Sequence, residues 1–206
     1  MAAYEALRAF EEMAATGANA PVLGIRVELA KLAAGQLVRF NQVTAELASQ
    51  TPDVVTAMAP YQDALEAFHD AIVPTDWPEA MMKTSLTAGL ISDLADRMAP
   101  YIGEQLNGLL GWGAVNPRTA DFAAAMVEQW LEGHPADAGR LALLGRRLAG
   151  EMVSQAQRLF TRDADLAALV TGTKAADGSD LEAVGHLLES MVDANTRRLR
   201  GMGLGM

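Results

Sequence analysis

Apolar residues recur every three to four positions along most of the chain, a spacing that places them on one face of a helix. The longest example covers residues 23–49, where the repeating apolar positions are Leu23, Val27, Ala30, Ala34, Leu37, Phe40 and Val43. A polar residue and a proline in residues 19–21 (NAP) precede it, as is typical of a helix start. The pattern therefore predicts one long helix in this region.

The same spacing predicts further helices. They cover about residues 2–16, 54–72, 77–98, 100–110, 117–133, 139–160 and 180–200. The most regular of them has one apolar face, formed by Leu141, Leu144, Leu148 and Met152. Pro60 lies inside residues 54–72, where its missing amide donor predicts a kink or a break. The glycine-rich residues 108–113 predict a loop around Trp112, and Pro117 then predicts the start of the next helix.

No stretch alternates apolar and polar residues as a strand would, so the predicted fold class is all-α. Several long helices with polar breaks between them suit a four-helix bundle with additional flanking helices. A chain of 206 residues, half of them hydrophobic, can bury one substantial core. We therefore expect a single domain over 1–206, with a core bundle over about 2–133 and C-terminal helices over about 139–201 packed on it. Residues 171–179 (TGTKAADGS) predict a flexible linker before the last helix.

Composition excludes several functions. The chain has no cysteine, which removes disulfides and thiolate metal ligands and is compatible with a reducing cytoplasm. Its formal net charge of -10 opposes nucleic-acid binding at long range, and its one basic cluster, Arg197, Arg198 and Arg200, is typical of a helix C-terminus. No apolar run is long enough to cross a membrane. The first residues (MAAYEALRAFEE) carry acids where a signal peptide needs a basic start, so we expect a cytoplasmic protein.

Several stretches resemble one protein family in their order and spacing. They are residues 59–69 (APYQDALEAFH), 74–80 (PTDWPEA), 139–151 (GRLALLGRRLAGE), 154–158 (SQAQR) and 197–204 (RRLRGMGL). The chain resembles bacterial ferritin-like proteins that are similar to the methylthio-isopentenyladenosine tRNA hydroxylases, and the likeness covers nearly its whole length. The resemblance implies a helical bundle that houses a diiron centre and uses oxygen.

The resemblance also implies where the iron ligands would lie, and the chain departs from the pattern at each place. Where the family has a glutamate on the first helix, this chain has Ala6, and where the family has Glu-x-x-His, it has Gln36 and Arg39. An acid of the family falls at Ala88, and an acid followed by histidine falls at Asn116 and Thr119. Alanine offers no donor atom, and the always-charged guanidinium of Arg39 repels a cation. We therefore predict that the diiron centre is lost, with no metal, cofactor or catalytic residue at these vestigial positions. Arg39 would fill the vacated space and pair with a carboxylate.

One pair of residues keeps the spacing of a metal site. Glu66 and His69 form the only Glu-x-x-His in the chain, and residues three apart share one helix face. This pair stands on a different helix from the family's site, and neither His134 nor His186 supplies a second pair. The simpler interpretation of His69 is a structural histidine at a helix end near Pro74. A metal role for Glu66 and His69 is the alternative.

Two functional hypotheses from different classes follow. The favoured one is a non-catalytic structural or interaction module, acting as a homodimer or beside a ferritin-like paralogue that keeps its ligands, with Trp112 and Trp130 as interface anchors where exposed. The alternative is an enzyme, a diiron or mononuclear oxygenase. Such an enzyme would hold iron with rearranged ligands such as Glu5, Glu28, Glu66 and His69. A third hypothesis is that the space left by the metals binds a small apolar ligand.

Overall fold

Helices account for all the regular structure in the described part of the chain, so the predicted all-α class is confirmed. The computed structural model describes residues 1–103, 112–172 and 180–205, with residues 112–114 and 180–181 described by their backbone alone. The α-helices are α1 (Ala2–Ala18), α2 (Leu23–Gln50), α3 (Val54–Met58), α4 (Gln62–Ala71), α5 (Trp77–Met98), α7 (Trp112–Gly133), α8 (Ala138–Arg162), α9 (Ala164–Thr171) and α10 (Asp180–Gly201). Three short 3-10 turns join them: η1 (Ala59–Tyr61), η2 (Ala99–Tyr101) and η3 (Pro135–Asp137).

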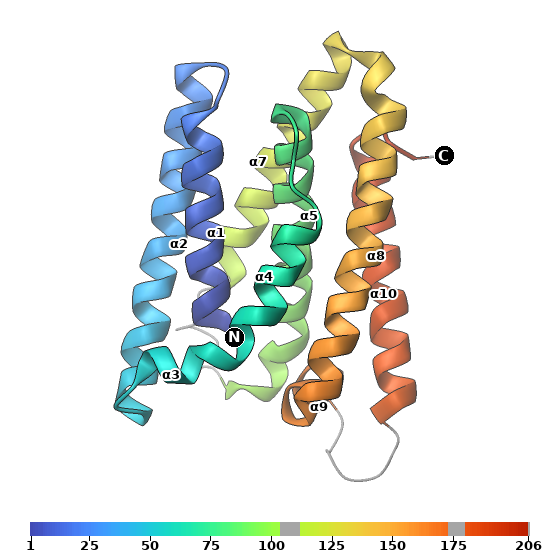
Figure 1. Cartoon of the computed structure of the whole chain (residues 1–206). Helices are drawn as coiled ribbons and strands as arrows, with labels where there is room; N and C mark the ends of the chain where they lie inside the picture. The colour runs from blue at the N-terminus through green and yellow to red at the C-terminus, as the bar shows by residue number, and fades with distance from the viewer. Residues whose placement is uncertain (104–111, 173–179, 206) are drawn as a thin grey trace.

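The long helices form antiparallel pairs that lie side by side (Figure 1). Helices α1 and α2 pack along each other, α5 and α7 form the next pair, and α8 packs with α10. The first two pairs make a four-helix bundle, and α8 and α10 flank it through contacts with α5. The chain crosses from α2 to α5 through α3 and α4, and α4 packs on α8. None of the described helices is long and apolar enough to cross a membrane.

Polar caps set the helix boundaries as the sequence indicates. Asp76 accepts a hydrogen bond from the backbone amide of Glu79 at 3.1 Å at the start of α5. The carboxylate of Glu79 in turn accepts from the amide and hydroxyl of Thr75, both at 2.8 Å. The first bond satisfies a backbone donor that a helix start leaves without an intrahelical partner, and the other two hold the residue before the cap against the first turn. The predicted break at Pro60 is also confirmed, because η1 separates α3 from α4 there.

The start of α7 differs from its prediction. The helix begins at Trp112, so Gly113 lies inside it instead of in a loop, and Pro117 stands more than a turn inside the helix instead of at its start. Proline removes one backbone donor from a helix, but packing against neighbours contributes most of a helix's stability in proteins. Helix α7 packs along α5, and near its start Asn116 accepts a hydrogen bond from Gln36 of α2 at 2.6 Å, so neighbouring helices support its first turns. The predicted helix over 100–110 and linker over 171–179 lie largely outside the described residues.

Most of the periodic apolar residues of α2 face outward, although Phe40 and Val43 are half-buried. The pattern correctly predicts the helix, but Leu23 is 75% exposed, and Val27, Ala30, Ala34 and Leu37 are exposed as well. The residues of α2 that are buried in the protein are Leu29, Leu32, Ala33, Gln36 and Arg39. Helix α2 therefore has an apolar outer face and a mixed inner face, which contacts α1 and α7.

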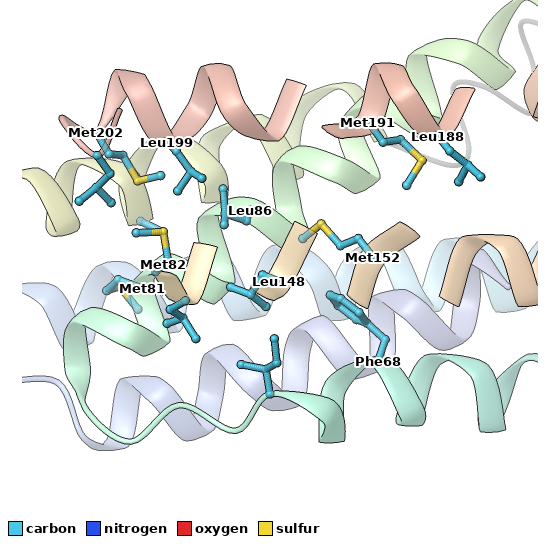
Figure 2. Close-up of a cluster of buried hydrophobic side chains, with 14 of the residues drawn as sticks. Phe68, Met81, Met82, Leu86, Leu148, Met152, Leu188, Met191, Leu199 and Met202 are labelled. Atoms are coloured by element: carbon cyan, nitrogen blue, oxygen red, sulfur yellow. The ribbon is translucent and has the colours of Figure 1, made fainter. Parts of the chain in front are cut away.

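The largest apolar core joins α5, α8 and α10 (Figure 2). Leu148 and the other predicted apolar residues of α8 are buried in it, together with Met82 and Leu86 of α5. Helix α10 also fixes its last turn on α5, where Arg198 donates to the backbone oxygen of Gly89 at 3.0 Å and pairs with Asp93 at 2.6 Å. Within the basic cluster, Arg198 is thus a structural residue.

Candidate functional site

The positions that the sequence singles out as vestigial ligands lie deep in the bundle. All six are buried: Ala6, Gln36, Arg39, Ala88, Asn116 and Thr119. Four of them line one small cavity of about 20 Å³, with Gln36 from α2, Ala88 from α5, and Asn116 and Thr119 from α7. Ala6 on α1 is buried but does not line this cavity, whereas its neighbour Glu5 does. The structure therefore brings residues from all four bundle helices to one place.

A chain of polar contacts crosses this interior. Arg39 Nη2 lies 2.6 Å from Glu5 Oε2, and both side chains are more than nine-tenths buried. Arg39 Nη1 donates to Gln36 Oε1 at 3.1 Å, and Gln36 Nε2 donates to Asn116 Oδ1 at 2.6 Å. The contacts link α1, α2 and α7. The prediction that Arg39 pairs with a carboxylate is confirmed, and the carboxylate is that of Glu5.

The remaining space at this point is small. A volume of about 20 Å³ accommodates roughly one water molecule. Asn116 Nδ2, a buried polar atom on its wall, has no hydrogen-bond partner among the described residues. The hydroxyl of Thr119 donates to the Val115 backbone oxygen at 2.9 Å, within its own helix. Water is therefore the natural occupant of this cavity.

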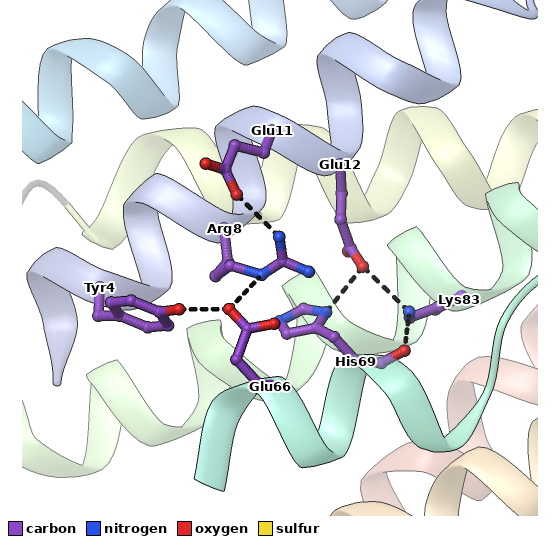
Figure 3. A network of polar contacts seen from close by, with 7 residues as sticks. All are labelled: Tyr4, Arg8, Glu11, Glu12, Glu66, His69 and Lys83. Atoms are coloured by element: carbon purple, nitrogen blue, oxygen red, sulfur yellow. Dashed lines mark hydrogen bonds and ion pairs between the residues drawn. The ribbon is translucent and has the colours of Figure 1, made fainter. Parts of the chain in front are cut away.

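A second polar network joins α1, α4 and α5 (Figure 3). His69 Nδ1 lies 2.8 Å from Glu12 Oε1, and Lys83 Nζ lies 3.0 Å from the same oxygen. Lys83 also donates to the backbone oxygen of His69 at 2.8 Å. Burial alone raises the pKa of Glu12, but hydrogen bonds and charges from His69 and Lys83 outweigh it and lower the pKa to about 2. Glu12 is therefore a carboxylate held between two partners.

Glu66 has partners of its own in the same region. Tyr4 donates to Glu66 Oε1, and Arg8 Nε lies 3.4 Å from that oxygen (Figure 3). Burial, together with the hydrogen bond to Glu66 and its charge, raises the pKa of the Tyr4 hydroxyl to about 12. Glu66 and His69 share a helix, but each is committed to different groups of α1. Among the described residues, no group of three or more His, Asp or Glu is placed to hold a metal ion.

Comparison with protein-family models matches residues 1–173 to the ferritin-like domain of actinomycetes. The chain belongs to this ferritin-like family. The matched segment comprises α1 to α9, and so contains the whole four-helix bundle and both polar networks. No curated protein matches the chain. The ferritin-like bundle with flanking helices, predicted from the sequence, is thus confirmed by the structure and the family match together.

The other residues singled out in the sequence lie away from the interior of the ferritin-like bundle. Glu28 pairs with Lys31 on the outer surface of α2, with 2.6 Å between Oε1 and Nζ. His134 stacks on Trp130 with 4.0 Å between ring centroids, and His186 is exposed on α10. The indole of Trp130 is partly buried and donates to Asp137 at 2.8 Å. The side chain of Trp112 lies outside the described residues.

The ferritin-like bundle also borders a larger cavity of about 90 Å³, whose walls are almost entirely apolar. Three residues line both cavities: Glu5, His69 and Thr87. Glu5 and Arg39, which pair with each other, also line the apolar cavity. Sequence reasoning missed the ion-pair partners Glu12 and Lys83. One signal was present, since Lys83 directly follows two methionines on the apolar helix α5, and an ammonium there needs a buried partner.

Proposed function

We propose that this ferritin-like protein has lost its diiron centre and acts as a non-catalytic interaction module in the form of a homodimer. Loss of the diiron centre is supported by the chain of polar contacts through Glu5, Arg39, Gln36 and Asn116 in the bundle interior. Under this proposal the chain descends from a diiron ancestor of the tRNA-hydroxylase type. Amide, guanidinium and methyl groups now stand at its ligand positions.

The donor set around the small cavity does not fit two irons. Such a centre uses about six protein ligands, mainly carboxylates with some imidazoles. The carboxylates lining the cavity are Glu5 and Glu12, and each already holds a cationic side chain. The guanidinium of Arg39 keeps its charge at any physiological pH and would repel a metal ion. Arg39 and Lys83 thus supply the positive charge that irons would otherwise provide.

The rearranged ligands required by an iron oxygenase are dispersed. Glu28 pairs with Lys31 on the exposed side of α2, and Glu66 pairs with Tyr4 and Arg8 outside the small cavity. His69 reaches the cavity wall, but its Nδ1 is taken by Glu12. These positions disfavour the enzyme hypothesis and favour a module whose interior is structural.

Metal analysis tests this part of the proposal. The purified protein is loaded with ferrous iron under reducing conditions, desalted, and analysed for iron content. We expect far less than one iron per chain, and no change in the Glu66→Ala and His69→Ala variants. About two irons per chain, lost in either variant, would overturn the proposal and support the oxygenase.

The interaction surface in this proposal is the outer face of α2. Exposed apolar or small residues recur there at alternating spacings of four and three, the spacing of a coiled-coil seam: Leu23, Val27, Ala30, Ala34 and Leu37. Continued to Asn41, this stripe is about 27 Å long. Alanines at its middle allow a second helix to approach closely. We call these six residues the α2 stripe.

Charge favours a second copy of the same helix as the partner of the α2 stripe. Arg26 flanks its N-terminal end, and Glu46 lies on α2 beyond its C-terminal end. Two copies that pack antiparallel about a twofold axis bring Arg26 of each protomer toward Glu46 of the other. The stripe itself carries no charged residue, so contact there avoids the repulsion expected between surfaces of a protein with net charge -10.

Light scattering coupled to size-exclusion chromatography tests the homodimer. We expect the wild-type protein to be a dimer at micromolar concentration. Ala34→Glu would bring two carboxylates together at the seam and yield a monomer with unchanged helical content. The matched control is Leu143→Glu on α8, where the native leucine is 55% exposed and outside the α2 stripe. A dimer that survives Ala34→Glu would refute the surface, and a monomeric wild type would refute the homodimer in favour of a paralogue as partner.

A further inference from the structure

The apolar cavity of about 90 Å³ is lined by residues of seven helices: α1, α2, α4, α5, α8, α9 and α10. Phe68, Met152 and Met191, which line it, project toward a shared interior space from α4, α8 and α10 (Figure 2). All three side chains are more than nine-tenths buried. These walls belong to the folded core, whereas other lining residues, such as Ala64, Leu65 and Leu159, are only partly buried.

A void of this size is uncommon in a native core. Protein interiors are packed like organic crystals, with few voids larger than a water molecule. Water gains little in an apolar cavity because it finds too few hydrogen-bond partners, and such cavities instead take up small apolar molecules. An engineered apolar cavity of about 150 Å³, for comparison, binds benzene. The cavity here is smaller, so its occupant is a small molecule or one that the walls adjust to admit.

The walls contain side chains that can adjust. Met98, Met152 and Met191 come from three different helices and all line the cavity. Methionine is unbranched and polarisable, and it repacks around differently shaped partners at little cost. Together with Met1, which also lines the cavity, these methionines suit an apolar guest better than branched residues would.

One wall also offers a polar contact. Thr87 Oγ1 is buried, and it has no hydrogen-bond partner within the described part of the chain. Thr87 lines the apolar cavity, as Glu5 and Arg39 do. A buried hydroxyl without a partner is costly, and a guest with a hydroxyl or carbonyl oxygen would satisfy it. The two charges of Glu5 and Arg39 are already paired with each other, so they do not call for a charged guest.

We propose that this cavity binds a small uncharged molecule with an apolar body and a single hydroxyl or carbonyl group. The apolar body packs against Phe68 and the three methionines, and the oxygen bonds to Thr87. The site is separate from the α2 stripe and does not depend on dimer formation. It requires no metal.

Methionine methyl NMR on the full chain tests the site, with cyclohexanol and benzene as probes. We expect both probes to shift the methyl signals of Met98, Met152 and Met191. Met13 serves as the internal control because it belongs to a separate apolar cluster around α1 and α2. Absence of shifts at Met98, Met152 and Met191, or equal shifts at Met13, would overturn the proposal.

Two variants locate the guest within the cavity. Thr87→Val removes the hydroxyl at nearly constant volume and should weaken cyclohexanol binding about tenfold while leaving benzene affinity unchanged. Ala156→Leu places extra carbons on a wall of the cavity and should abolish binding of both probes. Equal loss of both probes in Thr87→Val would refute the polar contact. Undiminished binding in a folded Ala156→Leu protein would refute the site.

Discussion

Arg39 and Glu5 form an ion pair inside the bundle, with Nη2 and Oε2 2.6 Å apart and both side chains almost fully excluded from solvent. Taking two charges out of water is costly, and their mutual attraction offsets that cost only when further hydrogen bonds satisfy the remaining atoms. Arg39 meets this condition through Gln36, whose amide continues the chain to Asn116. The pair therefore ties α1 to α2, and through Gln36 to α7, at the centre of the bundle.

Removing one member of this pair should be more harmful than removing both. We expect Arg39→Met to lower the free energy of unfolding by about 3–5 kcal/mol, because Glu5 would remain buried without a cation. The double variant Arg39→Met with Glu5→Gln should recover most of that loss. Urea unfolding followed by circular dichroism measures both values.

A surface pair provides the control for this experiment. Lys31→Met breaks the exposed ion pair with Glu28 on the same helix and should change stability by less than about 1 kcal/mol. If the effects of Arg39→Met and Glu5→Gln simply add in the double variant, the buried pair contributes no coupling. That outcome would contradict the structural role assigned to it.

Glu12 should make the protein sensitive to acid. Its folded-state pKa of about 2 lies below the ordinary 4.5, so its contribution to stability is present above about pH 4.5 and is lost as the pH falls toward 2. The contribution is at most about 3 kcal/mol. In the Glu12→Gln variant, the free energy of unfolding should therefore fall less steeply between pH 5 and pH 2 than in wild type. Equal slopes in urea titrations at each pH would contradict the assignment.

Local signals in the sequence predict the helix boundaries well, because a cap needs only neighbouring residues. Asp76 and Glu79 lie three positions apart, and the hydrogen bond from the Glu79 amide to the Asp76 carboxylate depends only on the local helix start. Pro60 breaks its helix because its ring removes the backbone amide donor and clashes with the preceding turn. The early start of α7 was missed because contacts with distant helices, such as the bond between Gln36 and Asn116, leave no local signal in the sequence.

The partners of buried charges could not be predicted, because they lie far apart in the chain. Arg39 was expected to find a carboxylate, but nothing near it in sequence indicates Glu5, and Lys83 meets Glu12 across 71 positions. The outward direction of the α2 stripe was missed for a related reason. Both faces of α2 carry apolar residues, and periodicity alone does not tell which face meets the core.

Disulfide cross-linking should report the direction of pairing across the α2 stripe. The chain has no cysteine, so a single introduced thiol can link only to its copy in the partner. Pairing of Arg26 with Glu46 of the other protomer places the twofold axis near residue 36, so Leu37→Cys should cross-link on oxidation. Leu23→Cys should not, because its copy would lie about 39 Å away along the helix axis. Cross-linking of both variants would indicate parallel pairing and contradict the proposed arrangement.

Substitution of two glycines of α8 by alanine should change the free energy of unfolding in opposite directions. A Cβ at Gly145 would overlap the side chain of Leu199, which is buried where α10 packs on α8, whereas a Cβ at Gly150 would meet no other atom. Alanine in a helix interior is favoured over glycine by about 1 kcal/mol, so Gly150→Ala should stabilise the protein by up to that amount. Gly145→Ala has the same helical gain, but overpacking typically costs about 1–3 kcal/mol, so a net loss of stability is expected. Urea unfolding of the two variants side by side measures the difference, and a Gly145→Ala protein as stable as Gly150→Ala would show that α8 and α10 are not in close contact at this point.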